Sequence, residues 1–176
     1  GIPKTKNISD SSTIRAMLAV RKHGGIIGLY PEGNRNWDGV TGPLFPATAK
    51  LIKKFRIPVL TVLSTGNKLI QPRWSRHARS GPLFIDFRLL FSEADCETLS
   101  EQEIAARLEQ ALAHDDHPAA EARTTAAGLP FRYRGKRLAE RLERFLFQCV
   151  GCGGVDTLSS LDDRLTCARC GLSVRY

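Results

Sequence analysis

The chain has few acidic residues and no long hydrophobic run. Its 176 residues contain 18 Asp and Glu against 26 Lys and Arg, a formal net charge of +8. No apolar stretch approaches the roughly 18–20 residues that a membrane-spanning helix needs. No positively charged leader followed by an apolar run is visible either, so the sequence shows no signal peptide. The basic excess favours anionic partners, which include phospholipid head groups, phosphate-bearing substrates and nucleic acid.

The length is sufficient for one hydrophobic core. With 176 residues, of which 42% are hydrophobic, the chain can form one domain plus at most a small module. It begins with Gly1 rather than methionine and enters patterned sequence at once. We therefore expect a piece of a longer protein, and a missing targeting segment carries little weight.

Hydrophobic patterns predict alternating helices and strands in the first third of the chain. A cluster of capping residues ahead of periodic apolar residues predicts a helix over 10–23, and the apolar run at 25–30 predicts a buried strand. A helix is expected over 44–56, followed by a strand over 57–63. Two strands joined by a helix form a βαβ unit, so we expect an α/β fold with a parallel or mixed sheet flanked by helices.

The patterns continue beyond this unit. Residues 64–81 have a loop-like composition, and 82–91 predict another strand. A capping box, Ser100 with Glu103, predicts a helix that ends near residue 113.

The second half divides by composition. The segment 114–130 is rich in Ala, His, Asp and Gly and is interpreted as a linker. Its His114-Asp115-Asp116-His117 cluster is interpreted as solvated rather than as a metal or base site. We thus expect an α/β domain over 1–113, a linker over 114–130, a helix over 131–148 and a cysteine module over 149–176.

Four cysteines near the C-terminus form two CxxCG repeats separated by fourteen residues. A glycine after each second cysteine lets the backbone turn, so that its amides face the sulfurs. Four thiolates at this spacing are typical of a closed, structural Zn²⁺ site. Two disulfides or a redox pair are the alternatives, and disulfides are disfavoured because nothing else indicates an oxidising compartment. The expected zinc ligands are Cys149, Cys152, Cys167 and Cys170.

The role of this zinc ribbon has two interpretations. Zinc ribbons in basic proteins can bind nucleic acid through arginine contacts to phosphate. Against this, the module carries Asp156, Asp162 and Asp163, and Tyr176 is its only aromatic residue. Without aromatic side chains on which bases stack, we favour a structural or docking role.

The segment Pro31-Glu32-Gly33-Asn34-Arg35 follows the strand expected over 25–30. Proline ends the ladder because it has no N–H to donate, and ligands bind at strand ends in α/β sheets. A carboxylate, a glycine and an arginine there offer a hydroxyl acceptor, a close backbone approach and a fork that matches phosphate. The alternative is a tight turn in which Glu32 and Arg35 pair in water.

This segment resembles the PEG(T/S/N)R block of the glycerol-phosphate acyltransferase family, which includes the 1-acylglycerol-3-phosphate (lysophospholipid) acyltransferases. Ile57-Pro58-Val59-Leu60-Thr61-Val62 resembles the family's fourth block, at a fitting distance, and the resemblance spans roughly residues 1–91. It implies acyl transfer from acyl-CoA or acyl-carrier protein to a glycerol-phosphate or lysophospholipid hydroxyl in phospholipid biosynthesis. It also implies a cytoplasmic protein that is peripheral to the membrane.

The resemblance assigns roles to individual residues. Glu32 and Gly33 would shape the acceptor site, and Arg35 would hold the acceptor phosphate. Lys4 stands roughly where the family's second block places an arginine, although a lysine lacks the guanidinium fork. Trp37 would cover the site, insert at a lipid interface, or pack against the following helix.

The family's general base has no counterpart here. In the family, the histidine of an HxxxxD block removes the proton of the attacking hydroxyl, and the aspartate orients the imidazole. None of the four histidines has Asp five positions later. We expect the C-terminal part of an acyltransferase, inactive alone, which supplies acceptor recognition. A paralogue that has lost catalysis is another interpretation. The rival function is a non-enzymatic zinc-ribbon module that binds nucleic acid, a partner that we do not favour.

Overall fold

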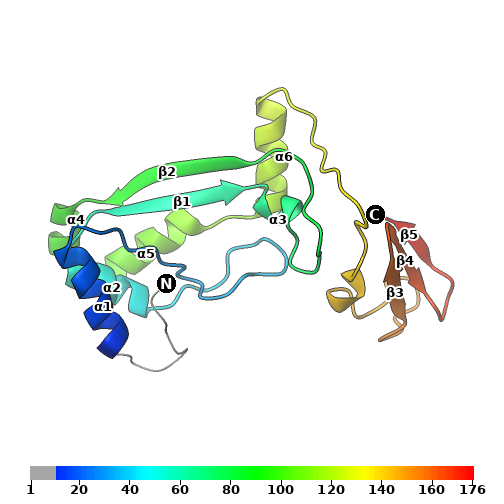
Figure 1. Cartoon of the computed structure of the whole chain (residues 1–176), viewed down its shortest axis with the longest axis horizontal. Helices are drawn as coiled ribbons and strands as arrows, with labels where there is room; N and C mark the ends of the chain where they lie inside the picture. Colours follow the sequence, from blue (N-terminus) through cyan, green and yellow to red (C-terminus); the bar gives the residue numbers. More distant parts are fainter. Residues whose placement is uncertain (1–10) are drawn as a thin grey trace.

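The computed structural model describes residues 11–176, which form a mixed α/β structure with two small antiparallel sheets (Figure 1). The expected mixture of helices and strands is thus confirmed, but both sheets are antiparallel rather than parallel or mixed. The elements in chain order are α1 (Ser11–Lys22), α2 (Ala47–Phe55), β1 (Val59–Thr65), α3 (Asn67–Ile70), β2 (Phe84–Phe91), α4 (Glu93–Thr98), α5 (Glu101–Leu112), α6 (Asp116–Ala126), the 3₁₀ turn η1 (Leu142–Arg144), β3 (Leu158–Leu161), β4 (Arg164–Cys167) and β5 (Ser173–Arg175).

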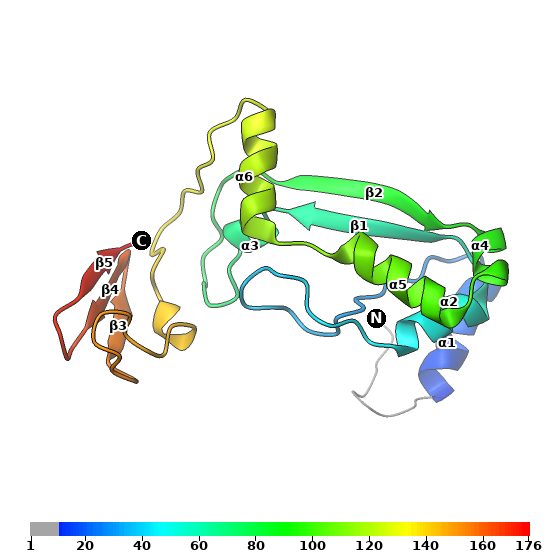
Figure 2. The ribbon, with the colours of Figure 1, turned by 180° about the vertical axis from the view of Figure 1, so that it is seen from behind.

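The first sheet is an antiparallel pair, β1 with β2. Helix α5 runs along one face of this pair, and α6 packs against β1 at its end (Figures 1 and 2). The other face carries apolar side chains that are between 51% and 71% exposed, namely Leu60, Val62, Ile85, Phe87 and Leu89. The register places Leu60 opposite Leu89 and Val62 opposite Phe87, so these side chains share a face.

The prediction of a parallel βαβ unit is wrong. Residues 25–30 form no strand, and within this segment Ile26 is 97% exposed and Tyr30 is 92% exposed. Strand β1 takes β2 as its partner instead, and the chain reverses through α3 and the loop that follows. A strand needs a second strand to satisfy its N–H and C=O groups, and β-propensity alone could not show which pairs would form.

The larger hydrophobic core lies between α2, α4, α5 and the end of β2. Phe91 and Ile104 are fully buried in it, together with Ala49, Ile52, Cys96 and Leu108. Two capping boxes fix the starts of α4 and α5. In each, a serine side chain accepts a backbone N–H and the third helical residue's carboxylate accepts one in return, Ser92 with Asp95 and Ser100 with Glu103.

The segments interpreted as a linker and a helix have other structures. Helix α6 occupies most of 114–130. Pro118 is a sequence signal for the start of this helix, because proline is favoured in the first turn of a helix. Residues 131–148 contain only the short turn η1, so the helix expected there is wrong. Arg137 and Arg141 have φ angles of 54° and 72°, a left-handed conformation that interrupts an α-helix.

The C-terminal sheet has the order β3-β4-β5, with both pairs antiparallel. Its core side chain, Leu165, packs with Leu142 and with Trp74 from the loop between α3 and β2. The same loop holds the buried Arg79, whose guanidinium donates to the Leu138 carbonyl and lies over the Tyr176 ring. The C-terminal sheet is therefore docked on this loop (Figure 2).

Candidate functional site

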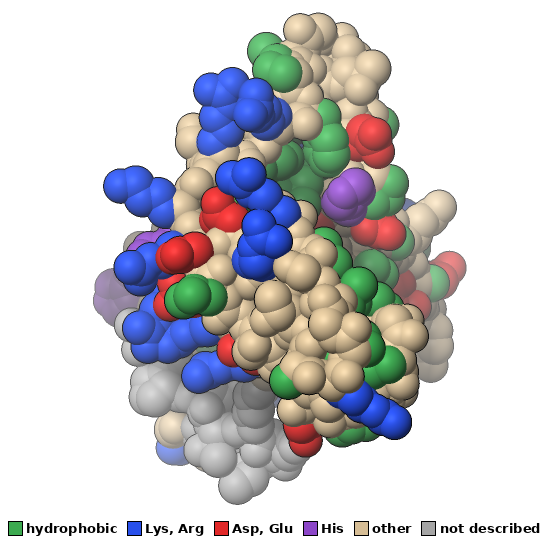
Figure 3. Space-filling model, turned by 90° about the vertical axis from the view of Figure 1, so that its right-hand side faces the viewer, with side chains coloured by type: hydrophobic (Ala, Val, Ile, Leu, Met, Phe, Trp, Pro, Cys, Tyr) green, Lys and Arg blue, Asp and Glu red, His purple; other side chains and the backbone are tan. Residues whose placement is uncertain are grey.

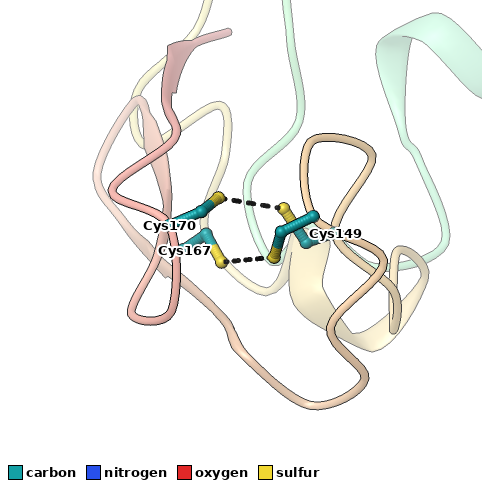
Figure 4. A group of neighbouring side chains, drawn as sticks. Cys149, Cys167 and Cys170 are labelled. Atoms are coloured by element: carbon teal, nitrogen blue, oxygen red, sulfur yellow. Dashed lines mark hydrogen bonds between the residues drawn. The ribbon is translucent and has the colours of Figure 1, made fainter.

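The two CxxCG repeats form two tight turns that face each other. In the first, the Gly153 amide donates to the Cys149 carbonyl at 2.8 Å; in the second, the Gly171 amide donates to the Cys167 carbonyl at 3.0 Å. Both glycines have positive φ, 67° and 73°. Glycine adopts this conformation at no steric cost, which explains its place after each second cysteine. The turns bring all four sulfurs to one point (Figure 4).

The spacing of the sulfurs fits a tetrahedral metal ion. The sulfurs of Cys149 and Cys170 lie 3.7 Å apart, and those of Cys152 and Cys167 lie 3.8 Å apart. All four are within 4.8 Å of one another. A Zn–S bond of about 2.3 Å places the corners of a tetrahedron about 3.8 Å apart. The cluster could therefore hold a metal ion such as zinc, as the spacing predicted.

Hydrogen bonds around the sulfurs prepare part of the cluster for metal binding. The Thr157 hydroxyl, 3.2 Å from the Cys167 sulfur, and the amides of Cys170 and Arg169 lower the pKa of the Cys167 thiol to about 6. At Cys170 the Leu172 amide also acts to lower the pKa, but the Cys152 thiol, burial and the other two thiols raise it to about 11. Four sulfurs this close cannot all ionise unless a cation joins them, so metal binding should release protons.

The loop over residues 31–45 is closed by its own hydrogen bonds. The Phe45 amide donates to the Pro31 carbonyl at 2.8 Å, and the Gly33 amide donates to the Tyr30 carbonyl at 2.9 Å. Gly33 has φ of 67°, and a Cβ there would lie only 2.1 Å from the Phe45 ring. Glycine is required at this position for both reasons.

Glu32 braces the same loop from inside. Its Oε2 accepts the Gly42 amide at 2.8 Å and lies 3.5 Å from the Asn36 amide nitrogen. The alternative in which Glu32 pairs with Arg35 does not occur in the structure: no Glu32–Arg35 ion pair forms among the described residues. The geometry thus gives Glu32 and Gly33 a role in shaping the loop.

Arg35 is exposed on this braced loop. Its Nη2 donates to the Gln71 carbonyl at 3.0 Å, and the Arg73 guanidinium donates to the Arg35 carbonyl. Within residues 11–176 neither arginine has a carboxylate at ion-pair distance. Lys4 lies outside the described residues. Arg35 is therefore joined by Arg73, a residue that the sequence motifs did not indicate.

Trp37 has its ring partners in distant parts of the chain. Its ring stacks on Phe145 with centroids 6.1 Å apart, and the Arg73 guanidinium lies over the Trp37 ring, 4.4 Å from its centroid. The indole remains 39% exposed. No sequence signal linked Trp37 to Phe145, because more than a hundred residues separate them.

The His114–Asp116 cluster is more buried than its composition suggested. The Asp116 side chain is buried, accepts the Gly66 amide at 2.6 Å and the Lys68 amide at 2.8 Å, and lies 3.2 Å from His114 Nε2. The interpretation of these two residues as solvated is wrong. Asp116 joins the start of α6 to the start of α3, which anchors the helix that replaces the expected linker.

Comparison with known protein families, with curated proteins and with solved structures finds no match for this chain. The likeness to acyltransferases thus rests on the two sequence blocks. Among the described residues, none of the helices has the length and apolar character needed to cross a bilayer.

Proposed function

We propose that this chain contributes the acceptor-binding part of an acyltransferase that acts on a glycerol-phosphate or lysophospholipid at a membrane surface. The observation that carries the proposal is Arg35, an exposed guanidinium without an acidic partner in residues 11–176, on a loop braced by Glu32 and Gly33. A fixed loop loses little entropy when a ligand binds, so its arginine is well prepared for a phosphate.

In the proposed reaction the acceptor hydroxyl attacks the carbonyl carbon of an acyl thioester from acyl-CoA or acyl-carrier protein. The hydroxyl proton passes to a general base, an ester forms, and the thiolate leaves. Arg35 would hold the acceptor phosphate and so fix the position of the hydroxyl. The proposal assigns the general base to sequence outside these 176 residues, because no HxxxxD block occurs in them.

We further propose that the four-cysteine cluster holds zinc as a structural ion. Four protein sulfurs complete a tetrahedron and leave no open position for a substrate. Binding of zinc would close the module over 149–176, a described segment whose only buried apolar side chain besides the candidate ligands Cys149 and Cys167 is Leu165. Metal analysis after expression with zinc should find one ion per chain, and no bound metal would contradict this assignment.

The acceptor proposal is tested by titrating the chain with glycerol 3-phosphate and, separately, with glycerol. Arg35→Ala should weaken glycerol 3-phosphate binding roughly tenfold or more, because a charged hydrogen bond is lost. Arg15→Ala is the matched control, because Arg15 is exposed on α1. This substitution removes the same charge at a position outside the Arg35 loop. Equal binding by wild type and Arg35→Ala would remove Arg35 from the site.

Competition separates this proposal from the nucleic-acid rival. The chain is offered vesicles containing anionic lipid and a duplex DNA at physiological salt. Retention on the vesicles supports the proposal. Preferential, strongly salt-dependent binding to DNA would favour the rival, because phosphate contacts release counterions.

A further inference from the structure

A stack of four side chains joins the Arg35 loop to the zinc ribbon. The Arg73 guanidinium lies over Trp37, Trp37 stacks on Phe145, and Phe145 stacks on Trp74. The centroids of Phe145 and Trp74 are 5.3 Å apart, with the rings 12° from parallel. Three separate parts of the chain meet in this stack.

The base of the stack, Trp74, is packed against the ribbon. Trp74 is only 6% exposed and packs with Leu142 and Leu165, and Leu165 belongs to β4. Phe145 directly follows η1, four positions before the zinc-ligand candidate Cys149. The top of the stack, by contrast, is open, because Trp37 is partly exposed and Arg73 is exposed. The ribbon therefore holds one rigid ring beneath an accessible guanidinium.

Two side-chain hydrogen bonds join the Arg35 loop to the segment 71–73. Arg73 donates to the main chain of Arg35, and Arg35 donates to the main chain of Gln71, two residues before Arg73. Each guanidinium has five N–H donors, so most remain available. Neither guanidinium has a carboxylate partner in residues 11–176. The two positive charges therefore repel each other, and an anion bound between them would relieve that repulsion.

We propose that Arg73 is a second phosphate-binding side chain beside Arg35, and that the aromatic stack on the zinc ribbon sets its position. This inference rests on the proposed function of the Arg35 loop and extends it. Two forked guanidiniums suit the doubly charged phosphate monoester of a glycerol-phosphate or lysophosphatidate head group better than one does. In this arrangement the zinc ribbon supports the acceptor site through Phe145.

The surface agrees with an anionic ligand at this end of the molecule. Figure 3 shows Lys and Arg side chains gathered along one side of the face that the ribbon end presents, with fewer Asp and Glu side chains between them. An excess of positive over negative side chains attracts phosphate esters and anionic lipid surfaces alike. The two sources share the same phosphate chemistry, so the experiment must test each.

The test compares phosphate binding by four chains: wild type, Arg35→Ala, Arg73→Ala and the control Arg15→Ala. Glycerol 3-phosphate and inorganic phosphate probe a free phosphate, and phosphatidylcholine vesicles with lysophosphatidate probe a lipid head group. For every probe that the wild type binds, Arg73→Ala and Arg35→Ala should each weaken binding about tenfold. Arg15→Ala should leave the binding unchanged. Bound zinc and circular dichroism verify folding.

The outcomes separate the two proposals. Normal binding by Arg73→Ala with weak binding by Arg35→Ala overturns the role of Arg73 and leaves the proposed function intact. Normal binding by both variants overturns both proposals. Arg73→Lys keeps the charge without the fork or the flat face, and should recover only part of the affinity.

The aromatic stack has its own readout, because Trp37 and Trp74 are the only two tryptophans of the chain. Phe145→Leu keeps an apolar side chain but removes the ring between them. It should shift tryptophan emission to longer wavelength and weaken phosphate binding several-fold, with zinc still bound at one ion per chain. Unchanged phosphate affinity in a Phe145→Leu chain whose emission has shifted would overturn the positioning role.

Discussion

The two sheets of this protein are stabilised in opposite ways. The ribbon gathers four sulfurs within 4.8 Å and docks its small core on Trp74. The β1–β2 pair has helices on one face and leaves five large apolar side chains exposed on the other. In one region four candidate metal ligands from two short turns meet at one point, whereas the other region depends on contacts between distant segments. The difference matters because, under our proposal, zinc on these sulfurs supplies the stability that the small apolar core of the ribbon lacks.

The largest expected effect is loss of the proposed zinc site. Cys167→Ser should abolish stoichiometric zinc binding, since serine does not replace a thiolate ligand at neutral pH, and the free energy at stake in such sites is of order 10 kcal/mol. Hydrogen exchange followed by mass spectrometry should then show rapid exchange over 149–176 and unchanged protection in α5.

The fifth cysteine provides the matched control for this comparison. Cys96 is fully buried in the larger core, far from the ribbon, with its sulfur 3.5 Å from the Ile57 carbonyl oxygen. Cys96→Ala should keep one zinc per chain. Loss of zinc in this variant, or loss of α5 protection in Cys167→Ser, would show that the two regions fold as one unit.

The sequence predicted the ribbon better than the larger region for a physical reason. The candidate ligands Cys149 and Cys152 lie three positions apart in one turn, and a glycine with positive φ follows each cysteine pair. The short spacing therefore determines the local geometry. The helices over 10–23, 44–56 and 100–113 were likewise predicted, because capping and periodicity are local signals.

Pairings over long distances were not accessible in the same way. Neither the antiparallel pairing of β1 with β2 nor the meeting of Trp37 with Phe145 follows from spacing. The candidate phosphate site was therefore half predicted: Arg35 came from a contiguous motif, but Arg73 joins it only through the folded loop after α3.

The next largest effect concerns the core under the open sheet. Ile104 is fully buried between α2, α5 and Phe91, so Ile104→Ala should lower the free energy of unfolding by roughly 2–5 kcal/mol. Urea denaturation measures this loss, and zinc binding should persist. Phe87→Ser, on the exposed face, should change stability by no more than about 0.5 kcal/mol. A large loss of unfolding free energy in Phe87→Ser would mean that the open face of the β1–β2 pair is covered in solution.

A smaller effect is expected in the loop that lies between the two regions. Gly33→Ala places a methyl group against the Phe45 ring in a left-handed backbone conformation, and should cost roughly 1–3 kcal/mol. Gly28→Ala is the control, because a Cβ there meets no atom within 4 Å and the φ angle is not positive. Thermal unfolding compares the two variants. Equal melting temperatures would contradict the structural role assigned to Gly33.

The smallest effect is a pH dependence confined to the α/β region. Hydrogen bonds from the Ser92 side chain and amide lower the pKa of Asp95 below 3.8, and those from the Ser100 amide and side chain lower the pKa of Glu103 below 4.5. A carboxyl group with a lowered pKa in the folded state binds protons more readily when unfolded. Its stabilisation is therefore complete above the ordinary value and is lost as the pH falls through the lowered one.

Asp95→Asn and Glu103→Gln should accordingly reduce stability slightly at pH 7 and flatten its fall below pH 4.5, the higher of the two ordinary values. Denaturation curves of the zinc-loaded chain at several pH values, followed by the signal of the helices, measure this slope. Glu101→Gln is a matched control, since Glu101 lies in the first turn of α5 but outside the capping box. A slope that changes as much in Glu101→Gln would assign the acid sensitivity to helix charge in general, and not to the two reciprocal caps.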